Sequence, residues 1–231
     1  VLAAALARNR QVREAYPDGI VWISCGQELT RDDLVSRQRD LAEHLGGNID
    51  FESVTQGRGV LRELLAAKAI LLVLDDVWRA SDTEAFDVLG PSCRMLVTTR
   101  DAGILSALHG QLVPVSLFTE SEALQLLADA VEVERAALPP EALAVVKECG
   151  CLPLAIALSG GMATAGHSWQ DIVEALEEAD LEWAENRQAI NEQHRSIWRA
   201  MQASIGVLTE EEQRRFAELA ATRDARAREL D

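Results

Sequence analysis

Two adjacent acids at the end of an apolar run are the first residues in this sequence that could do chemistry. Asp75 and Asp76 follow the run Ile70 to Leu74, which is apolar on both faces and predicts a buried strand. Ligands bind open α/β folds at the carboxyl edge of the sheet, and nucleotide hydrolases place there one acid for Mg²⁺ and another that orients the attacking water. An acidic strand end that caps the following turn has the same sequence, so the pair alone leaves both interpretations open.

A second apolar run ends in an arginine. Met95 to Thr99 predicts a strand, and Arg100 and Asp101 follow it. The fork of donors on a guanidinium matches phosphate oxygens, so Arg100 is suited to binding a nucleotide phosphate at the same sheet edge. The alternative is a surface arginine paired with Asp101.

A tight corner between two helical segments is the third candidate. In the string Cys149 to Ala155, Gly150 ends one predicted helix and Pro153 begins the next at the first-turn position that proline tolerates. Taken alone, such a string is most often only a helix–helix corner.

The elements that position these residues change in kind along the chain. Strands are predicted over residues 20–25, 70–74, 94–99 and 111–116, with helices between them. Runs that are apolar on both faces and separated by helices indicate a parallel sheet covered on both sides. After Leu117 only helices are predicted, the first of them opened by a capping box from Thr119 to Glu122. We therefore expect an α/β core over residues 1–116, a helical bundle over 117–185 and a third segment over 186–231, frayed or disordered past Ala221.

Composition excludes several classes of function. The 231 residues carry a net charge of −16, which disfavours direct binding of nucleic acid. The four cysteines lack zinc-site spacing and suggest reduced thiols in a cytosolic protein. The longest apolar runs are too short to span a bilayer, so no membrane association is expected. The first residue is Val1, from which we expect a processed or truncated N-terminus.

Taken together, in this order and spacing, the motifs resemble the NB-ARC (AP-ATPase) family of STAND-class signalling P-loop ATPases. The resembling stretches are VWIS (21–24), LLVLDDVW (71–78), MLVTTRD (95–101), SEALQLL (121–127) and CGCLPLA (149–155). Residues 196–220 look like the start of the winged-helix subdomain that follows in such proteins. The resemblance covers nearly the whole chain and implies a P-loop NTPase-like fold.

The resemblance also implies roles for the candidate residues. Asp75 would be the Walker B acid that holds Mg²⁺ through water, and Asp76 the acid nearest the hydrolytic water. Arg100 would sense the terminal phosphate of ATP, and Pro153 would pack on the adenine base. Cys151 stands where the family often has glycine.

Two family motifs are missing from the sequence. The phosphate-binding loop, Gly-x-x-x-x-Gly-Lys-[Ser/Thr], and the strand before it should directly precede Val1, and Gly57-Arg58-Gly59 does not replace them. The later Met-His-Asp motif is also missing. We therefore expect an ATPase in the intact parent, whereas this chain alone should bind ATP very weakly and not hydrolyse it.

In the parent, the resemblance implies a switch that is closed with ADP and competent for assembly with ATP. Its partners would be nucleotide, other copies of the parent, and flanking effector and sensor domains. Two alternatives stay open: a nucleotide-free interaction scaffold on the same fold, and the switch module of a transcription regulator.

Overall fold

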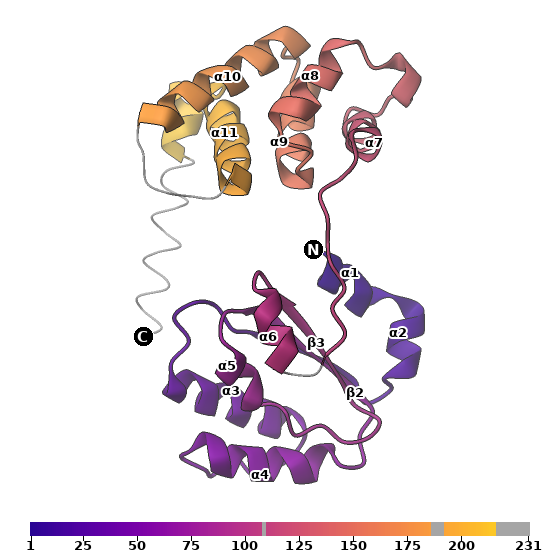
Figure 1. Cartoon of the computed structure of the whole chain (residues 1–231), viewed down its shortest axis with the longest axis vertical. Helices are drawn as coiled ribbons and strands as arrows, with labels where there is room; N and C mark the ends of the chain where they lie inside the picture. The colour runs from indigo at the N-terminus through magenta and orange to yellow at the C-terminus, as the bar shows by residue number, and fades with distance from the viewer. Residues whose placement is uncertain (108–109, 186–191, 216–231) are drawn as a thin grey trace. The chain divides into compact units, whose positions relative to one another are not determined.

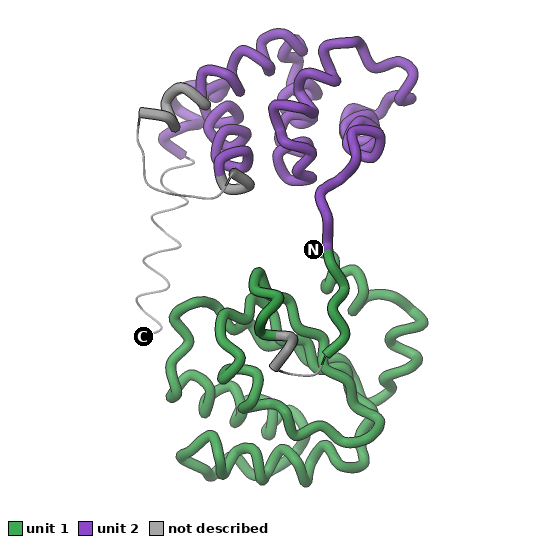
Figure 2. Tube along the Cα trace, in the orientation of Figure 1, with its two compact units in different colours: residues 1–114 green, residues 115–231 purple. Residues whose placement is uncertain are grey.

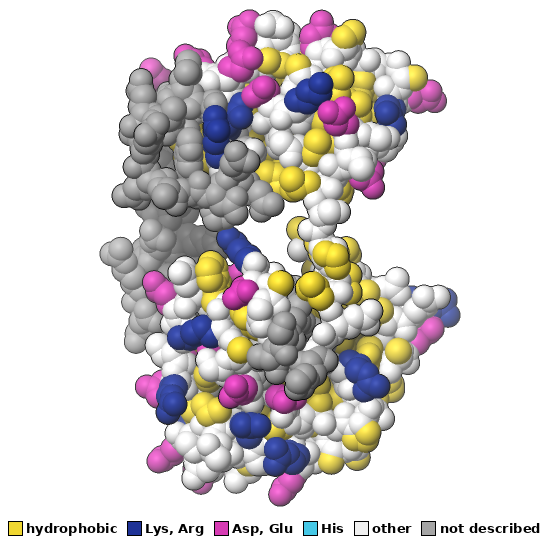
Figure 3. Space-filling view, viewed as in Figure 1, with side chains coloured by type: hydrophobic (Ala, Val, Ile, Leu, Met, Phe, Trp, Pro, Cys, Tyr) yellow, Lys and Arg dark blue, Asp and Glu magenta, His cyan; other side chains and the backbone are white. Residues whose placement is uncertain are grey.

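The computed structural model describes residues 1–107, 110–185 and 192–215. Its contacts divide the chain into two compact units, Val1–Pro114 and Val115–Asp231 (Figure 2). Basic and acidic side chains are interspersed over the surface of the α/β unit shown in Figure 3. Among the residues that the structure describes, none of the helices is both long and apolar enough to cross a membrane.

Unit 1 is built on a parallel sheet, which confirms the predicted α/β class. Its strands are β1 (Gly19–Ser24), β2 (Ile70–Val77) and β3 (Arg94–Thr99), in the order β1-β2-β3. Figure 1 labels β2 and β3. Gly19 pairs with Ile70 and Ser24 with Asp75, while Leu71 pairs with Arg94. The central strand β2 is buried along its apolar half, as a strand covered on both faces must be. It also runs three residues further than predicted, so the two acids lie in its last part.

The prediction of a strand over residues 111–116 is wrong. Residues 110–118 have no regular secondary structure, and Val113 and Val115 are 72% and 76% exposed. Their apolar alternation suits a strand, but a strand also needs a neighbour for its backbone groups, and Pro114 lacks the N–H donor. Among the described residues, β3 pairs only with β2.

Helices cover both faces of the sheet. One face packs against α3 (Arg31–His44), α4 (Val54–Leu65) and α5 (Ala80–Glu84), and α6 (Ala102–Ala107) follows β3. The other face, with Leu71 and Val73, packs against α1 (Leu2–Arg8) and α2 (Arg10–Ala15). Asn9 separates these two helices because its backbone is extended, and its side chain accepts hydrogen bonds from the N–H groups of Gln11 and Val12 in α2.

Unit 2 is helical in the parts that the structure describes. It contains α7 (Glu120–Ala130), the 3₁₀ turn η1 (Arg135–Ala137), α8 (Glu141–Glu148), α9 (Pro153–Thr164), α10 (Trp169–Glu185) and α11 (Glu192–Gly206) (Figure 1). Leu127, Ile156, Ile172 and Leu176 are fully buried in one shared core. The capping box at Thr119 and Glu122 forms as predicted.

The last described helix packs into the same core. Ala200 and Ala203 of α11 are buried in that core, and α11 contacts α9 and α10. The predicted boundary near residue 186 and the charged end past Ala221 lie outside the described residues.

Candidate functional site

The two acids lie at the carboxyl end of β2, where the backbone departs from regular strand geometry. Asp76 has φ 56°, in the left-handed region, and the pairing with β3 shifts register between Leu74 and Val77. The loop after β1 holds both peptide carbonyls: Cys25 N donates to Asp75 O at 2.8 Å, and Gly26 N donates to Asp76 O at 3.0 Å. The loop that follows the neighbouring strand therefore holds the backbone of the acid pair.

A threonine that the sequence analysis missed joins the two acids. Thr98 Oγ1 donates to Asp75 Oδ1 at 2.5 Å and accepts from Asp76 N at 2.9 Å. The signal that could have found it is strand alternation: Thr98 is two residues beyond Leu96, and Asp75 two beyond Val73. Leu96 and Val73 pack together on the α1 side of the sheet, so Thr98 and Asp75 share that side.

Arg100 follows β3 at the same edge of the sheet. β2 and β3 are parallel, so their carboxyl ends bring Asp75, Asp76 and Arg100 to one edge, as predicted for their placement. The Arg100 Cζ atom lies 5.5 Å from the centroid of the Trp78 ring, within the range of a cation–π contact. Asp101, offered above as the alternative partner, accepts a hydrogen bond from Gly103 N at 2.8 Å and so supports the start of α6. The roles of these residues toward a nucleotide stay predictions.

The acid pair suits a cation that is shared with a substrate. Within the part of the chain that the structure describes, no cluster of three His, Cys, Asp or Glu side chains could hold a metal ion by itself. Mg²⁺ usually keeps several waters and binds one or two carboxylates together with substrate phosphates. Both acids are half-buried at the carboxyl edge of the sheet, so Asp75 and Asp76 fit that mode of binding.

Pro153 lies in unit 2 and is described within that unit. It is the first residue of α9 and is exposed, and Leu154 beside it is 53% exposed. The turn before it has two left-handed residues, Gly150 at φ 59° and Cys151 at φ 55°. Only glycine adopts that conformation without steric cost, which accounts for the glycine that the family often has at the second position.

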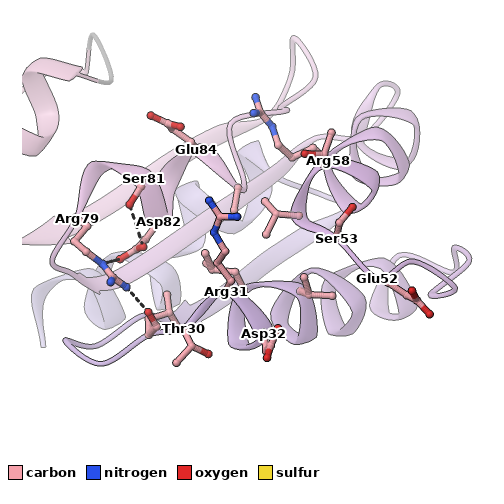
Figure 4. Close-up of a pocket in the computed structure, with 16 residues that line it drawn as sticks. Thr30, Arg31, Asp32, Glu52, Ser53, Arg58, Arg79, Ser81, Asp82 and Glu84 are labelled. Atoms are coloured by element: carbon pink, nitrogen blue, oxygen red, sulfur yellow. Dashed lines mark hydrogen bonds and ion pairs between the residues drawn. The ribbon is translucent and has the colours of Figure 1, made fainter.

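A cavity of about 580 Å³ lies elsewhere in unit 1, between the first turns of α3 and α4 and the start of α5 (Figure 4). Its wall includes Arg79, which pairs with the buried Asp82 at 3.1 Å. Neither Asp75, Asp76 nor Arg100 lines it. The cavity is therefore separate from the residues at the sheet edge.

Comparisons with known proteins show which sequences this chain is similar to. The profile of the NB-ARC domain matches residues 1–137. The chain is 30% identical to zebrafish (Danio rerio) apoptotic protease-activating factor 1 over 95% of its own length and 18% of that protein. It is 32% identical to the Arabidopsis thaliana probable disease resistance RPP8-like protein 2 over 72% of the chain and 19% of that protein.

A bacterial protein shows a comparable match. The regulatory protein AfsR of Streptomyces griseus is 28% identical over 74% of the chain and 18% of its own length. The chain thus spans about a fifth of the length of each of these three curated relatives.

Proposed function

This chain belongs to the NB-ARC domain family, a family of nucleotide-binding signalling modules, and from that premise we propose that its α/β unit reads the phosphates of ATP and ADP in a molecular switch. The observation that carries the proposal is the shared sheet edge, where β2 delivers Asp75 and Asp76 and β3 delivers Arg100. All three residues lie within the matched residues 1–137.

Each residue of the edge has a distinct task in this proposal. Asp75 holds Mg²⁺ through water, and Asp76 orients the water that attacks the terminal phosphate. When bound with nucleotide, Mg²⁺ neutralises phosphate charge. Arg100 contacts the terminal phosphate, which is the only group that distinguishes ATP from ADP. Pro153, exposed at the start of α9, packs on the adenine base in the proposed bound state.

The proposed switch depends on a difference between the affinities of the two conformational states for ATP and for ADP. A ligand shifts a conformational equilibrium only by the difference in its affinity for the two states, so a contact made only with ATP can drive the change. We propose that ADP holds the protein closed and that ATP makes it competent for assembly with other copies, in the cytosol. Since the chain spans about a fifth of its relatives, activity and partners of the whole protein belong to the proposal.

Calorimetry of the intact protein with ADP and ATP, each with and without Mg²⁺, tests the proposal. Arg100→Ala should weaken ATP more than ADP, whereas Asp75→Asn should remove the effect of Mg²⁺. Arg94→Ala is the matched control, because Arg94 begins the same strand and donates to the backbone carbonyls of Pro91 and Cys93. Equal weakening of ATP and ADP by Arg100→Ala would refute its sensing role. An intact wild-type protein that binds neither nucleotide would overturn the switch and favour an interaction scaffold.

A further inference from the structure

We infer that Thr98 is a positioning residue that sets the geometry of the acid pair, and through it the affinity for Mg²⁺ with nucleotide. The inference rests on the proposed function of the sheet edge and adds a residue to those assigned there. Thr98 acts through Asp75 and Asp76, which it touches directly.

The direction of the two hydrogen bonds is fixed by chemistry. A threonine hydroxyl has one proton, and the backbone N–H of Asp76 can only donate. The proton of Thr98 therefore points at Asp75 Oδ1, and its lone pair receives the Asp76 amide. With both bonds made, the hydroxyl holds the Asp75 carboxylate in one rotamer.

The other carboxylate oxygens of the pair are left for a ligand. Among the described residues, no hydrogen bond or ion pair reaches Asp75 Oδ2 or either carboxylate oxygen of Asp76. Both side chains are nevertheless half-buried. These oxygens can therefore contact a cation or the waters that it carries.

Thr98 also supports an unusual backbone conformation. Asp76 has φ 56°, which is uncommon for a residue other than glycine. β3 holds its N–H through Thr98, and the loop after β1 holds its C=O through Gly26. The peptide groups around Asp76 are thus held from both sides, and removing the hydroxyl releases one of them.

The experiment compares three variants of the intact protein. Thr98→Val keeps the size and branching of the side chain but removes both hydrogen bonds. Thr98→Ser restores the hydroxyl. Thr99→Val is the matched control, because the Thr99 hydroxyl accepts from Asp101 N at 3.0 Å and is not bonded to either acid. The probe is Mn²⁺ as a stand-in for Mg²⁺, titrated by electron paramagnetic resonance in the presence of ADP.

We expect Thr98→Val to weaken Mn²⁺ binding by about tenfold or more, since hydrogen bonds to charged groups are the stronger kind. Affinity for ADP without metal should change less than about twofold, and Thr98→Ser and Thr99→Val should resemble wild type. A purely structural role would lower the melting temperature of Thr98→Val but leave its metal affinity unchanged, which would overturn the inference.

Two further measurements keep the test decisive. If Asp75→Asn abolishes Mn²⁺ binding while Thr98→Val does not alter it, the proposed function stands and this inference fails. If wild type binds no Mn²⁺ with ADP, the proposed function itself fails. If Thr98→Val does not fold, hydrogen exchange of the Asp76 amide in the wild-type protein is measured instead. We expect this amide to exchange slowly, and exchange at the rate of an unprotected amide would overturn the inference.

Discussion

Replacing Gly57 by alanine tests how tightly the helices of the α/β unit pack on each other. Gly57 is a buried residue inside α4. A Cβ atom built on it would lie 2.2 Å from Gln38 Oε1 and 2.7 Å from Phe51 Cε2, closer than real contacts allow. Gln38 cannot easily move away, because it is fully buried and its Nε2 donates to Val54 O at 3.2 Å and to Ala85 O at 2.8 Å. The new methyl group must therefore displace a side chain that joins α3 to α4 and to the end of α5.

The change in the free energy of unfolding caused by Gly57→Ala has two opposing contributions, helix propensity and steric overlap. Alanine favours a helix over glycine by about 1 kcal/mol. Overpacking costs about 1–3 kcal/mol, and each hydrogen bond of Gln38 that is lost costs about 1 kcal/mol more. The clash exceeds the gain in helix propensity, so Gly57→Ala should lower the free energy of unfolding by roughly 2–4 kcal/mol.

The same helix provides the control. Gly59 is exposed, and a Cβ atom at that position meets no atom within 4 Å. Gly59→Ala should therefore stabilise the unit by about 0.5–1 kcal/mol through helix propensity alone. Urea unfolding followed by circular dichroism measures both variants against wild type. If Gly57→Ala is as stable as Gly59→Ala, the packing of Gln38 against α4 is not as described.

Two other sites give predictions of the same kind. Arg199→Met should lower the free energy of unfolding of the helical unit by roughly 2–4 kcal/mol, because buried Arg199 donates to Leu176 O at 3.1 Å and pairs with Glu148. Thermal melting measures the loss, and Arg199→Lys, which can keep only the ion pair, should lose less; equal losses would contradict the role of the carbonyl contact. Burial raises the pKa of the Cys25 and Cys149 thiols from 9.0 to about 11. These thiols therefore ionise at a lower pH in the unfolded chain than in the folded one, and the free energy of unfolding should fall as the pH rises from 9 towards 11. Both thiols should also resist a disulfide reagent at pH 8 until the protein unfolds, and rapid labelling of the folded chain would contradict their burial.

The sequence by itself determined those features whose signals are local. The apolar run from Ile70 predicted a buried central strand, because both faces of a covered parallel strand must be apolar. The capping box at Thr119 and Glu122 predicted the start of α7, because its two hydrogen bonds join residues three positions apart. Parallel strands also predicted that Asp75 and Arg100 would share one edge of the sheet.

One expectation failed because the local sequence pattern and the tertiary context disagree. Val113 and Val115 alternate like a strand, yet a strand forms only beside a partner, and the described residues supply none there. The deciding factor was that no strand among the described residues lies beside this segment to pair with it.

The link between Thr98 and the acid pair was decided only by the tertiary structure. Its hydroxyl meets Asp75 across 23 positions in sequence and Asp76 across 22. Residue type and spacing indicate that a threonine lies near a sheet edge. They do not fix the strand register, the shift after Leu74 or the left-handed conformation of Asp76. These depend on how two strands pair, and pairing is a property of the folded sheet, because its hydrogen bonds join residues that are distant in the chain.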